Sequence, residues 1–399
     1  MVPNGWEVSQ LKDLIEGSIK NGFSPNSADS ETGYWVLGLG ALGEDGIVAS
    51  EIKPVAPQDK VLNNLLAKDD FLVSRSNTPD KVGRSVRFRG EVANCSYPDL
   101  MMRFRIDQRK ANKSFIEQQL KSSKVRTYFR NCAAGSSSTM VKINKGILEK
   151  TPVPTPPLQE QKKIAKILST WDKAIATSEQ LLANSQQQKK ALMQQLLTGK
   201  KRLLDKNGVR YSGEWHDVPL NTMAKVIVSP VDKKTEPNEI PVELCNYTDV
   251  YHNHQITRNI KFMKATATKS EIAKYTLHKG DVIITKDSET PGDIAVPALV
   301  SEDLKGVVCG YHLAIVRPNI DYLNGAFLNY LFSMQSTRYY FFTLATGATR
   351  FGLSVGGINR AHFRVPELAE QEIIAAVLSN ADQEISALQQ KLNTLKLEK

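Results

Sequence analysis

The sequence predicts a mixed α/β (α+β) fold in which two similar globular domains are separated by an antiparallel coiled coil of two long helices. Three observations lead to this fold class. Matching segments recur at an offset of about 210 residues, two long stretches carry apolar residues at heptad spacing, and short apolar runs of strand length stand between turn residues. With 399 residues, the chain is long enough for two or three domains.

The repeat is clearest in the segment that follows a proline in each half of the chain. Residues 158–161 (LQEQ) match residues 368–371 (LAEQ), and the similarity continues for several helical turns. Further matches lie upstream: Trp6 with Trp215, residues 70–75 with 281–286, and residues 133–135 with 345–347. The chain therefore consists of two copies of one unit, each a globular domain of about 155 residues followed by a helix.

The two helical segments carry the strongest signal. The 41 residues between Pro157 and Gly199 contain neither proline nor glycine, which allows one helix of about 60 Å. Apolar positions alternate in steps of four and three residues in both copies, as in a coiled-coil seam. A stripe this long needs a partner, so we expect the two helices to pack on each other. The alternative is that each helix packs only on its own globular domain.

Proline and glycine mark the domain boundaries. Residues 151–157 (TPVPTPP) form a stiff entry to the first helix, Gly199 stands at its end, and Asn207-Gly208 marks a turn. These signals predict four segments: a first globular domain at 1–154, a central helix at 155–205, a second globular domain at 206–365 and a C-terminal helix at 366–399.

Inside the globular domains, the pattern predicts short strands and two helices. The expected strands are Tyr34–Leu37, Phe71–Ser74, Arg84–Phe88, Val282–Thr285 and Leu313–Val316, and the expected helices are Lys113–Ser122 and Ala326–Tyr339.

The distribution of charge favours a polyanionic partner. The chain carries a formal net charge of +10, and residues 71–150 alone contain 17 Lys/Arg against 6 Asp/Glu. Residues 211–365 are nearly balanced, at 16 against 15. A dense, mostly arginine block suits a nucleic-acid phosphate backbone, although a solvated basic face would look the same.

The loops after the matching strands hold the candidate DNA-binding residues, because arginine, asparagine and hydroxyl side chains can read base edges or hold phosphates. The candidates are Arg75, Asn77, Arg84, Arg87, Ser136, Ser137 and Lys142 in the first copy and Lys286, Ser288, Thr349 and Arg350 in the second. Arg87, with Arg89, Arg103 and Arg105, could instead be an outward-facing strand residue without a DNA contact. Three polar seam positions of the first helix, Ser178, Ser185 and Lys189, are candidates for binding a partner protein.

Motifs for catalysis are weak. Residues 38–43 spell GxGxxG, but prolines at 54 and 57 leave no room for the helix that a dinucleotide site needs, so a turn is the better interpretation. His252 and His254 lack a nearby third metal ligand, and the four cysteines form no CxxC pair. No leader-like or membrane-spanning segment is evident. We therefore expect a cytoplasmic protein without an active site, metal or cofactor of its own.

The two-copy plan and the segments 157–161 (PLQEQ) and 192–200 (LMQQLLTGK) resemble the specificity (S) subunit of type I restriction–modification systems. The resemblance covers the whole chain and is most specific in the helices. It implies two domains that each read half of a bipartite, asymmetric DNA target, held by helices that act as a ruler.

The same resemblance assigns the chemistry to other chains. It implies that two methylation (M) subunits dock on the helices and that restriction (R) subunits join them. S-adenosylmethionine, ATP and magnesium would be bound by those partner subunits, which methylate adenine and cut DNA. One departure is that residues 389–399 lack the LLTGK sequence of the first copy. A stand-alone DNA-binding or coiled-coil scaffold protein is the alternative function.

Overall fold

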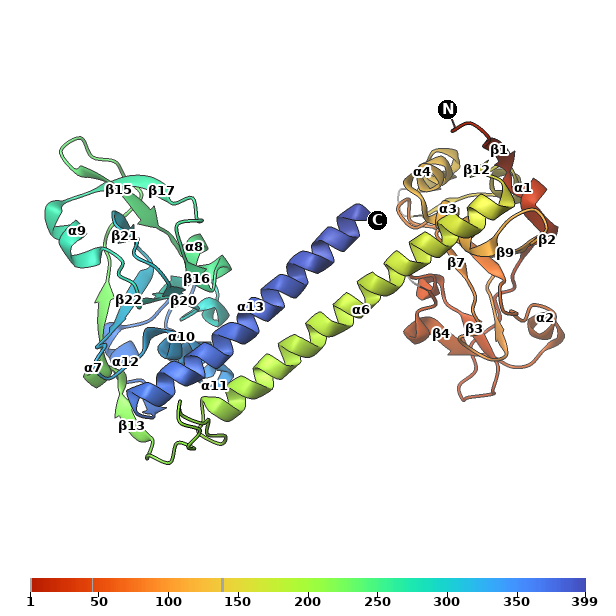
Figure 1. Cartoon of the computed structure of the whole chain (residues 1–399). Helices are drawn as coiled ribbons and strands as arrows, with labels where there is room; N and C mark the ends of the chain where they lie inside the picture. The colour runs from red at the N-terminus through yellow and green to blue at the C-terminus, as the bar shows by residue number, and fades with distance from the viewer. Residues whose placement is uncertain (1, 45, 138–139) are drawn as a thin grey trace. The chain divides into compact units, whose positions relative to one another are not determined.

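The computed structural model describes residues 2–44, 46–137 and 140–399 (Figure 1). They fall into two compact units, one comprising residues up to 176 together with 397–399, the other comprising residues 177–396. Each unit combines strands with helices, as the mixed α/β prediction requires. Among the helices of these described residues, none is both long and apolar enough to span a lipid bilayer.

The first unit is built on a four-stranded antiparallel sheet with a smaller three-stranded sheet beside it. The strands of the main sheet, in spatial order, are β2 (Ile15–Asn21), β9 (Met101–Ile106), β5 (Phe71–Ser74) and β7 (Ser85–Arg87). Those of the small sheet are β4 (Ile52–Pro54), β3 (Trp35–Leu37) and β8 (Cys95–Ser96). All four residues of β5 are buried, which explains the uninterrupted apolar run that predicted it.

The second unit repeats this plan with one additional strand. Its main sheet runs in the order β14 (Ala224–Val228), β22 (Leu313–Pro318), β18 (Val282–Thr285), β20 (Pro297–Val300) and β16 (Gln255–Ile256). Its small sheet contains β17 (Met263–Ala267), β15 (Ile240–Cys245) and β21 (Val307–Cys309). In both small sheets the central strand has one antiparallel and one parallel neighbour, so the internal repeat extends to strand direction.

Two consecutive helices follow the main sheet in each unit. They are α3 (Lys113–Lys121) and α4 (Ser123–Cys132) in the first unit, and α10 (Gly325–Ser333) and α11 (Gln335–Leu344) in the second. The single helix predicted at Ala326–Tyr339 is therefore wrong, because Met334 takes an extended backbone conformation that separates α10 from α11. Ser122 has the same extended conformation and separates α3 from α4. Its side chain caps α4 by accepting a hydrogen bond from the Val125 amide.

The structure confirms the prediction that the GxGxxG segment, residues 38–43, forms a turn. Residues Leu39–Ala41 form a single 3₁₀ turn (η1) after β3, and residues Ala49–Glu51 form another (η2) before β4. The backbone of the segment then turns back through the bridge between Leu42 and Ile47. In the described residues 46–54 the chain continues as η2 and β4, without an α-helix that could direct amide groups at a pyrophosphate.

Each globular domain closes on itself where its long helix begins. In the first unit β1 (Glu7–Gln10) pairs with β12 (Pro152–Thr155), and in the second β13 (His216–Pro219) pairs with β24 (His362–Val365). The remaining short helices are α1 (Leu11–Leu14), α2 (Asp59–Leu62), α5 (Lys145–Glu149), α7 (Leu220–Met223), α8 (Tyr247–His252), α9 (Lys269–Tyr275), α12 (Val355–Asn359) and the 3₁₀ turn η3 (Pro291–Asp293).

A buried glutamine attaches each long helix to its domain. The Gln161 side-chain amide donates to the Pro156 carbonyl (2.9 Å) and accepts from the Asn112 amide (2.8 Å). Gln371 makes the same pair of bonds to Pro366 and Asn324, both at 2.9 Å. Because both glutamines are almost completely buried, these bonds satisfy polar groups that water cannot reach.

The two long helices are α6 (Leu158–Leu196) and α13 (Leu368–Glu398). Within the second unit they run antiparallel, since residues later in α6 meet residues earlier in α13. Glu179 pairs with Lys396 (2.7 Å), and Lys189 pairs with Asp382. The predicted packing of helix on helix is therefore confirmed in this unit. The end of α6 and the start of α13 also join the core of the globular domain, so both modes of packing occur.

A buried carboxylate–arginine pair stabilises the central strands of each unit. Asp281 accepts two hydrogen bonds from Arg317, both at 2.8 Å, across the start of β18 and the end of β22. In the first unit, Asp70 takes the same position before β5 and pairs with Arg105 (2.5 Å) and Arg103 (3.3 Å). The aspartates are inaccessible to water, so each needs its cationic partner.

We predict that Arg317→Met destabilises the second unit by about 3–5 kcal/mol, because it leaves the Asp281 carboxylate buried without a counter-charge. Urea unfolding followed by circular dichroism would measure this. The matched control is Lys234→Met, which removes an exposed pair with Asp232 and should change the free energy of unfolding by less than about 1 kcal/mol. Equal effects of the two substitutions would contradict the prediction.

Candidate nucleic-acid interface

In the first unit, two loops that are distant in the sequence form one surface. The core strand β5 continues into the short strand β6 (Ser76–Asn77), which pairs with β11 (Met140–Lys142). β11 in turn pairs with β10 (Ala134–Ser137), and the Ile143 amide donates to the Arg75 carbonyl at 2.9 Å. We call the described residues 75–77, 134–137 and 140–142 surface 1.

The second unit assembles its counterpart in the same way. β19 (Asp287–Ser288) extends β18 and pairs with β23 (Phe351–Gly352), and the Leu353 amide donates to the Lys286 carbonyl at 3.0 Å. We call residues 286–288 and 346–352 surface 2. Each surface therefore combines the two loops that the sequence singled out separately, because backbone pairing brings them together.

The side chains of surface 1 differ in how available they are. Lys142 is exposed, and Arg75 is half-buried with its guanidinium 3.4 Å from the Asp99 carbonyl. Asn77 is buried and its amide is used locally, donating to Ser74 and accepting from the Thr78 amide. Ser136 and Ser137 lie in β10, but their side chains, like residues 138–139, are outside the described part. Asn77 is thus placed as a turn-stabilising residue.

Arg87 was predicted from the basic block at residues 71–150 to bind DNA, but the structure places it in ion pairs inside the domain. Its side chain is only 8% exposed and pairs with Asp69 (3.4 Å) and Glu117 (2.9 Å). Arg89 joins Glu117, and Lys113 joins Asp69. Much of the basic block is therefore neutralised inside the domain, partly by acidic residues just before residue 71. Arg84 is also half-buried, 3.4 Å from the Leu42 carbonyl.

On surface 2, some of the predicted side chains have partners within the domain and others are exposed. Lys286 is paired with Asp287 (2.6 Å), whose other oxygen is 3.1 Å from the His312 ring. Ser288 is buried, and its hydroxyl shares a 3.1 Å hydrogen bond with Tyr247. Thr349 and Arg350 are exposed. Among the predicted residues whose side chains the structure describes, the exposed ones are therefore Lys142 on surface 1 and Thr349 and Arg350 on surface 2.

An aromatic pair beside surface 2 was not predicted from the sequence. Tyr247 and Tyr251, one turn apart on α8, stack with ring centroids 5.6 Å apart. The Tyr251 hydroxyl donates to Asp293 (3.0 Å), and this hydrogen bond raises the pKa of Tyr251. The signal was available in the capping box formed by Asn246 and Asp249, which marks the start of a helix.

A pair of equivalent arginines fixes the loop that follows each surface. Arg126 of α4 donates to the carbonyls of Asp80 and Val82, both at 2.7 Å, and Arg338 of α11 donates to those of Gly292 and Ile294. Burial lowers the pKa of both guanidinium groups. The offset of 212 residues between them was the sequence signal. These arginines position backbone and are not free to bind a phosphate.

Of the three residues predicted to bind a partner protein, Ser178 is buried, and Ser185 and Lys189 contact the other long helix. Ser178 is only 5% exposed. The Ser185 hydroxyl donates to Glu384 (3.3 Å), and Lys189 pairs with Asp382 and lies over the Tyr330 ring. Ser185 and Lys189 thus have polar partners on α13, and the binding of another protein at these positions stays a prediction.

The described residues offer no obvious centre for redox or metal chemistry. Within residues 2–44, 46–137 and 140–399, no three His, Cys, Asp or Glu residues gather as metal ligands would. Cys95, Cys245 and Cys309 are buried, and burial raises the pKa of the Cys95 thiol to about 12. Such thiols are protonated and unreactive at neutral pH.

The fold and these surfaces define a tandem-repeat protein with two similar but chemically different recognition surfaces. The model of the type I restriction modification DNA specificity domain matches residues 3–184 and again residues 213–397. The chain therefore belongs to this family and carries two copies of its domain.

Relatives with a named function are consistent with this family membership. The chain is 25% identical over 341 residues to the putative type I restriction enzyme MjaX specificity subunit of Methanocaldococcus jannaschii, covering 81% of this chain and 79% of that protein. It is 28% identical over 206 residues to the MjaVIII specificity subunit of the same organism, covering 49% and 43%.

Solved structures share the fold. The S subunit of a type I restriction–modification system from M. genitalium aligns with a TM-score of 0.59 at 11% identity, and the alignment covers 100% of this chain and 95% of that one. A chain from a study of complex assembly and conformational transition in the type I R-M system aligns with a TM-score of 0.55 at 16% identity, with the same coverage.

The contrast between Lys142 and Arg87 gives a prediction for binding of DNA by the assembled complex. Lys142→Gln should reduce the slope of log K against log salt by about 0.9, the value for one lost phosphate contact, without a change in stability. Arg87→Gln should leave the slope unchanged and lower the free energy of unfolding. Fluorescence anisotropy between about 50 and 200 mM salt measures the slope. If Arg87→Gln reduced the slope and Lys142→Gln left it unchanged, Arg87 would be shown to contact DNA and the prediction would be wrong.

Proposed function

We propose that this chain is the specificity subunit that selects the DNA target of a type I restriction–modification complex, with each globular domain reading one half of a bipartite, asymmetric sequence. Family membership carries the assignment to DNA specificity. The bipartite reading rests on one observation of the structure: the fold presents the same composite surface twice, with different side chains on each copy.

The difference between the surfaces supports an asymmetric target. Surface 1 offers exposed Lys142, while surface 2 offers exposed Thr349 and Arg350 beside the tyrosine pair of α8. Arginine favours guanine edges, and hydroxyl groups can contact bases or phosphates. Two domains with one backbone plan but different side chains would therefore read different half-sites.

We assign the chemistry to partner subunits. In this proposal two methylation subunits transfer the methyl group from S-adenosylmethionine to adenine, and restriction subunits cut DNA with ATP and magnesium. The chain itself would bind none of these cofactors and would act in the cytoplasm, where its DNA target lies. The boundaries proposed for its parts remain 1–154, 155–205, 206–365 and 366–399.

The proposal is tested by exchanging the first domain. Replacing residues 1–150 with those of a related subunit should change one half of the methylated sequence and leave the other half unchanged, because the β1–β12 and β13–β24 pairs close each domain separately. Mapping of methylated adenines in cells that carry the complete operon gives the answer. Unchanged methylation after the exchange would show that this chain does not select the target.

We further propose that the long helices set the number of unread base pairs between the half-sites. A heptad inserted after Leu182 in α6 and another after Leu392 in α13 keeps the seam in phase, because seven residues restore the facing stripe and both positions lie about one turn from the Glu179–Lys396 pair. Each insertion adds about 10 Å of helix, so the spacer should lengthen by roughly three base pairs.

Methylation mapping would show two unchanged half-sites with a longer spacer. The control is the insertion in α6 alone, which leaves apolar seam residues without partners and should impair folding. A double-insertion variant that folds and still methylates sites with the original spacer would exclude the ruler.

A further inference from the structure

In the second unit, the segment that ends α6 is bound in a specific site. Arg202 donates to both oxygens of Glu370, each at 2.6 Å, and to the Gly213 carbonyl at 2.9 Å. Its guanidinium also lies 5.9 Å from the centre of the Trp215 ring. Glu370 is completely buried by this contact, so the arginine supplies the counter-charge that a buried carboxylate needs.

The rest of this segment fits the same site closely. Gly199 has φ +71°, and a Cβ added there would lie 3.2 Å from the Trp215 indole, so a glycine permits the approach. Leu196 and Leu197 are buried in the core cluster that also contains Ile374 and Leu378. The bound segment is thus defined by two leucines, a glycine and an arginine, at 196–197, 199 and 202.

The first unit contains the same site, and no segment of its described residues corresponds to the bound end of α6. Glu160 corresponds to Glu370 and Trp6 to Trp215, because Glu160 precedes the bridging Gln161 and Trp6 precedes β1 as Trp215 precedes β13. Glu160 is exposed and accepts one hydrogen bond, at 3.1 Å, from the Trp6 indole. Where the second unit supplies Arg202, the first unit supplies an indole N–H.

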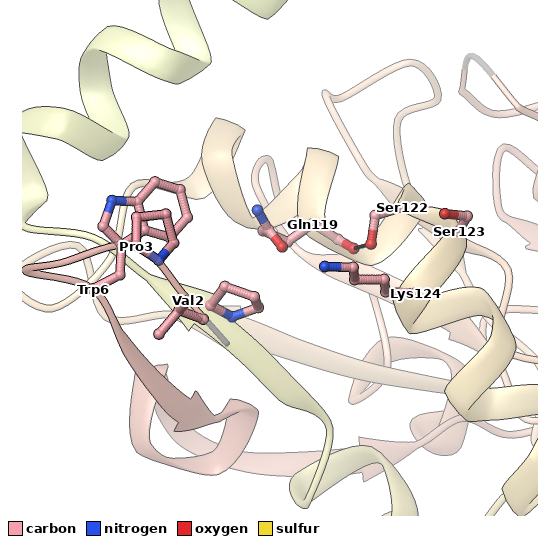
Figure 2. Close-up of a pocket in the computed structure, with 8 residues that line it drawn as sticks. Val2, Pro3, Trp6, Gln119, Ser122, Ser123 and Lys124 are labelled. Carbon is pink, nitrogen blue, oxygen red and sulfur yellow. Dashed lines mark hydrogen bonds between the residues drawn. The ribbon is translucent and has the colours of Figure 1, made fainter.

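The apolar part of the site is also open in the first unit. Ile374 and Leu378 are completely buried, whereas their equivalents Ile164 and Leu168 are only half-buried. Trp6 additionally lines a cavity of about 320 Å³ (Figure 2). The other residues that line it are Val2, Pro3, Gln119, Ser122, Ser123, Lys124 and Pro154.

The second unit shows what fills the equivalent space. Leu331 and Met334 stand where the first unit has Gln119 and Ser122, and they pack in the cluster that contains Leu196 and Leu197, with Leu203 against it. The cavity beside Trp6 is therefore lined by residues whose counterparts in the second unit belong to the core cluster that also contains the end of α6.

We propose that Glu160, Trp6, Ile164 and Leu168 form a docking site for a helix end of another subunit with the pattern leucine-leucine-x-glycine-x-x-arginine. Its arginine would pair with Glu160, its glycine would lie on Trp6, and its leucines would cover Ile164 and Leu168. A second copy of this chain is a poor donor, because its Leu196 and Leu197 are buried in its own second unit and its Arg202 already pairs with its own Glu370. The inference rests on the proposed function in naming the donor as a methylation subunit.

A peptide tests the site without any need for DNA. The probe is a fluorescein-labelled peptide with the sequence of residues 190–204 (KALMQQLLTGKKRLL), titrated with the full chain and followed by anisotropy. Saturable binding is expected. Glu160→Gln in the chain should weaken binding about ten- to hundredfold, and Arg202→Gln in the peptide should do the same. Combining both changes should cost little more than either alone, as for partners in one contact.

Three controls make the result specific. Glu16→Gln removes an exposed carboxylate of the same unit outside the site and should leave binding unchanged. Gly199→Ala in the peptide should weaken binding, because its methyl group would press on the indole. Circular dichroism verifies that each variant chain is folded. Absence of peptide binding, or binding that Glu160→Gln does not weaken, would overturn the site.

Competition identifies the donor. The unlabelled methylation subunit of the same operon should displace the labelled peptide from the chain, and a methylation subunit that binds without displacing it would overturn the assignment. Displacement by excess unlabelled chain would name a second copy as the donor and would also overturn it. Mapping of methylated DNA is independent of this site, so a failed docking site and a failed specificity function give different results.

Discussion

The buried amides of Gln161 and Gln371 are the contacts on which the arrangement of each unit depends. Each amide connects the first turn of a long helix to the proline that follows β12 or β24. It also connects that turn to the residue that precedes α3 or α10. Because the amide is buried and both of its ends are used, any shift of the helix start would leave polar groups unsatisfied. The helix direction is thus fixed to the domain that carries the recognition surface.

Buried charge has a structural role in the same domains. The Asp70 and Asp281 carboxylates hold arginines against the core strands, and Asp69 with Glu117 engages Arg87 and its neighbours. A chain with net charge +10 therefore presents fewer free cations near its first surface than its composition suggests. Arg126 and Arg338 in addition donate to backbone carbonyls of the loops that follow surfaces 1 and 2, so these cations also have a structural role.

The duplication leaves the two units chemically unequal. The second unit contains its own arginine-bearing segment and buries Glu370, while the first exposes the equivalent Glu160 beside Trp6. Equivalent backbones thus present a filled site in one unit and an open site in the other. A protein that binds near the start of a long helix would therefore meet a different environment in each unit.

The sequence by itself determined the repeat, the two long helices and the buried core strands, because heptad spacing, proline boundaries and uninterrupted apolar runs are local signals. It also singled out the loops after β5 and β18, which the fold combines into surfaces 1 and 2. Only the tertiary structure decided which side chains are free. Arg87, Asn77 and Ser178 have residue types suited to ligands. However, Arg87 pairs with Glu117, which is distant in the sequence, Asn77 is hydrogen-bonded within its own turn, and Ser178 is buried. Exposure and pairing depend on contacts across the fold, and no local pattern records them.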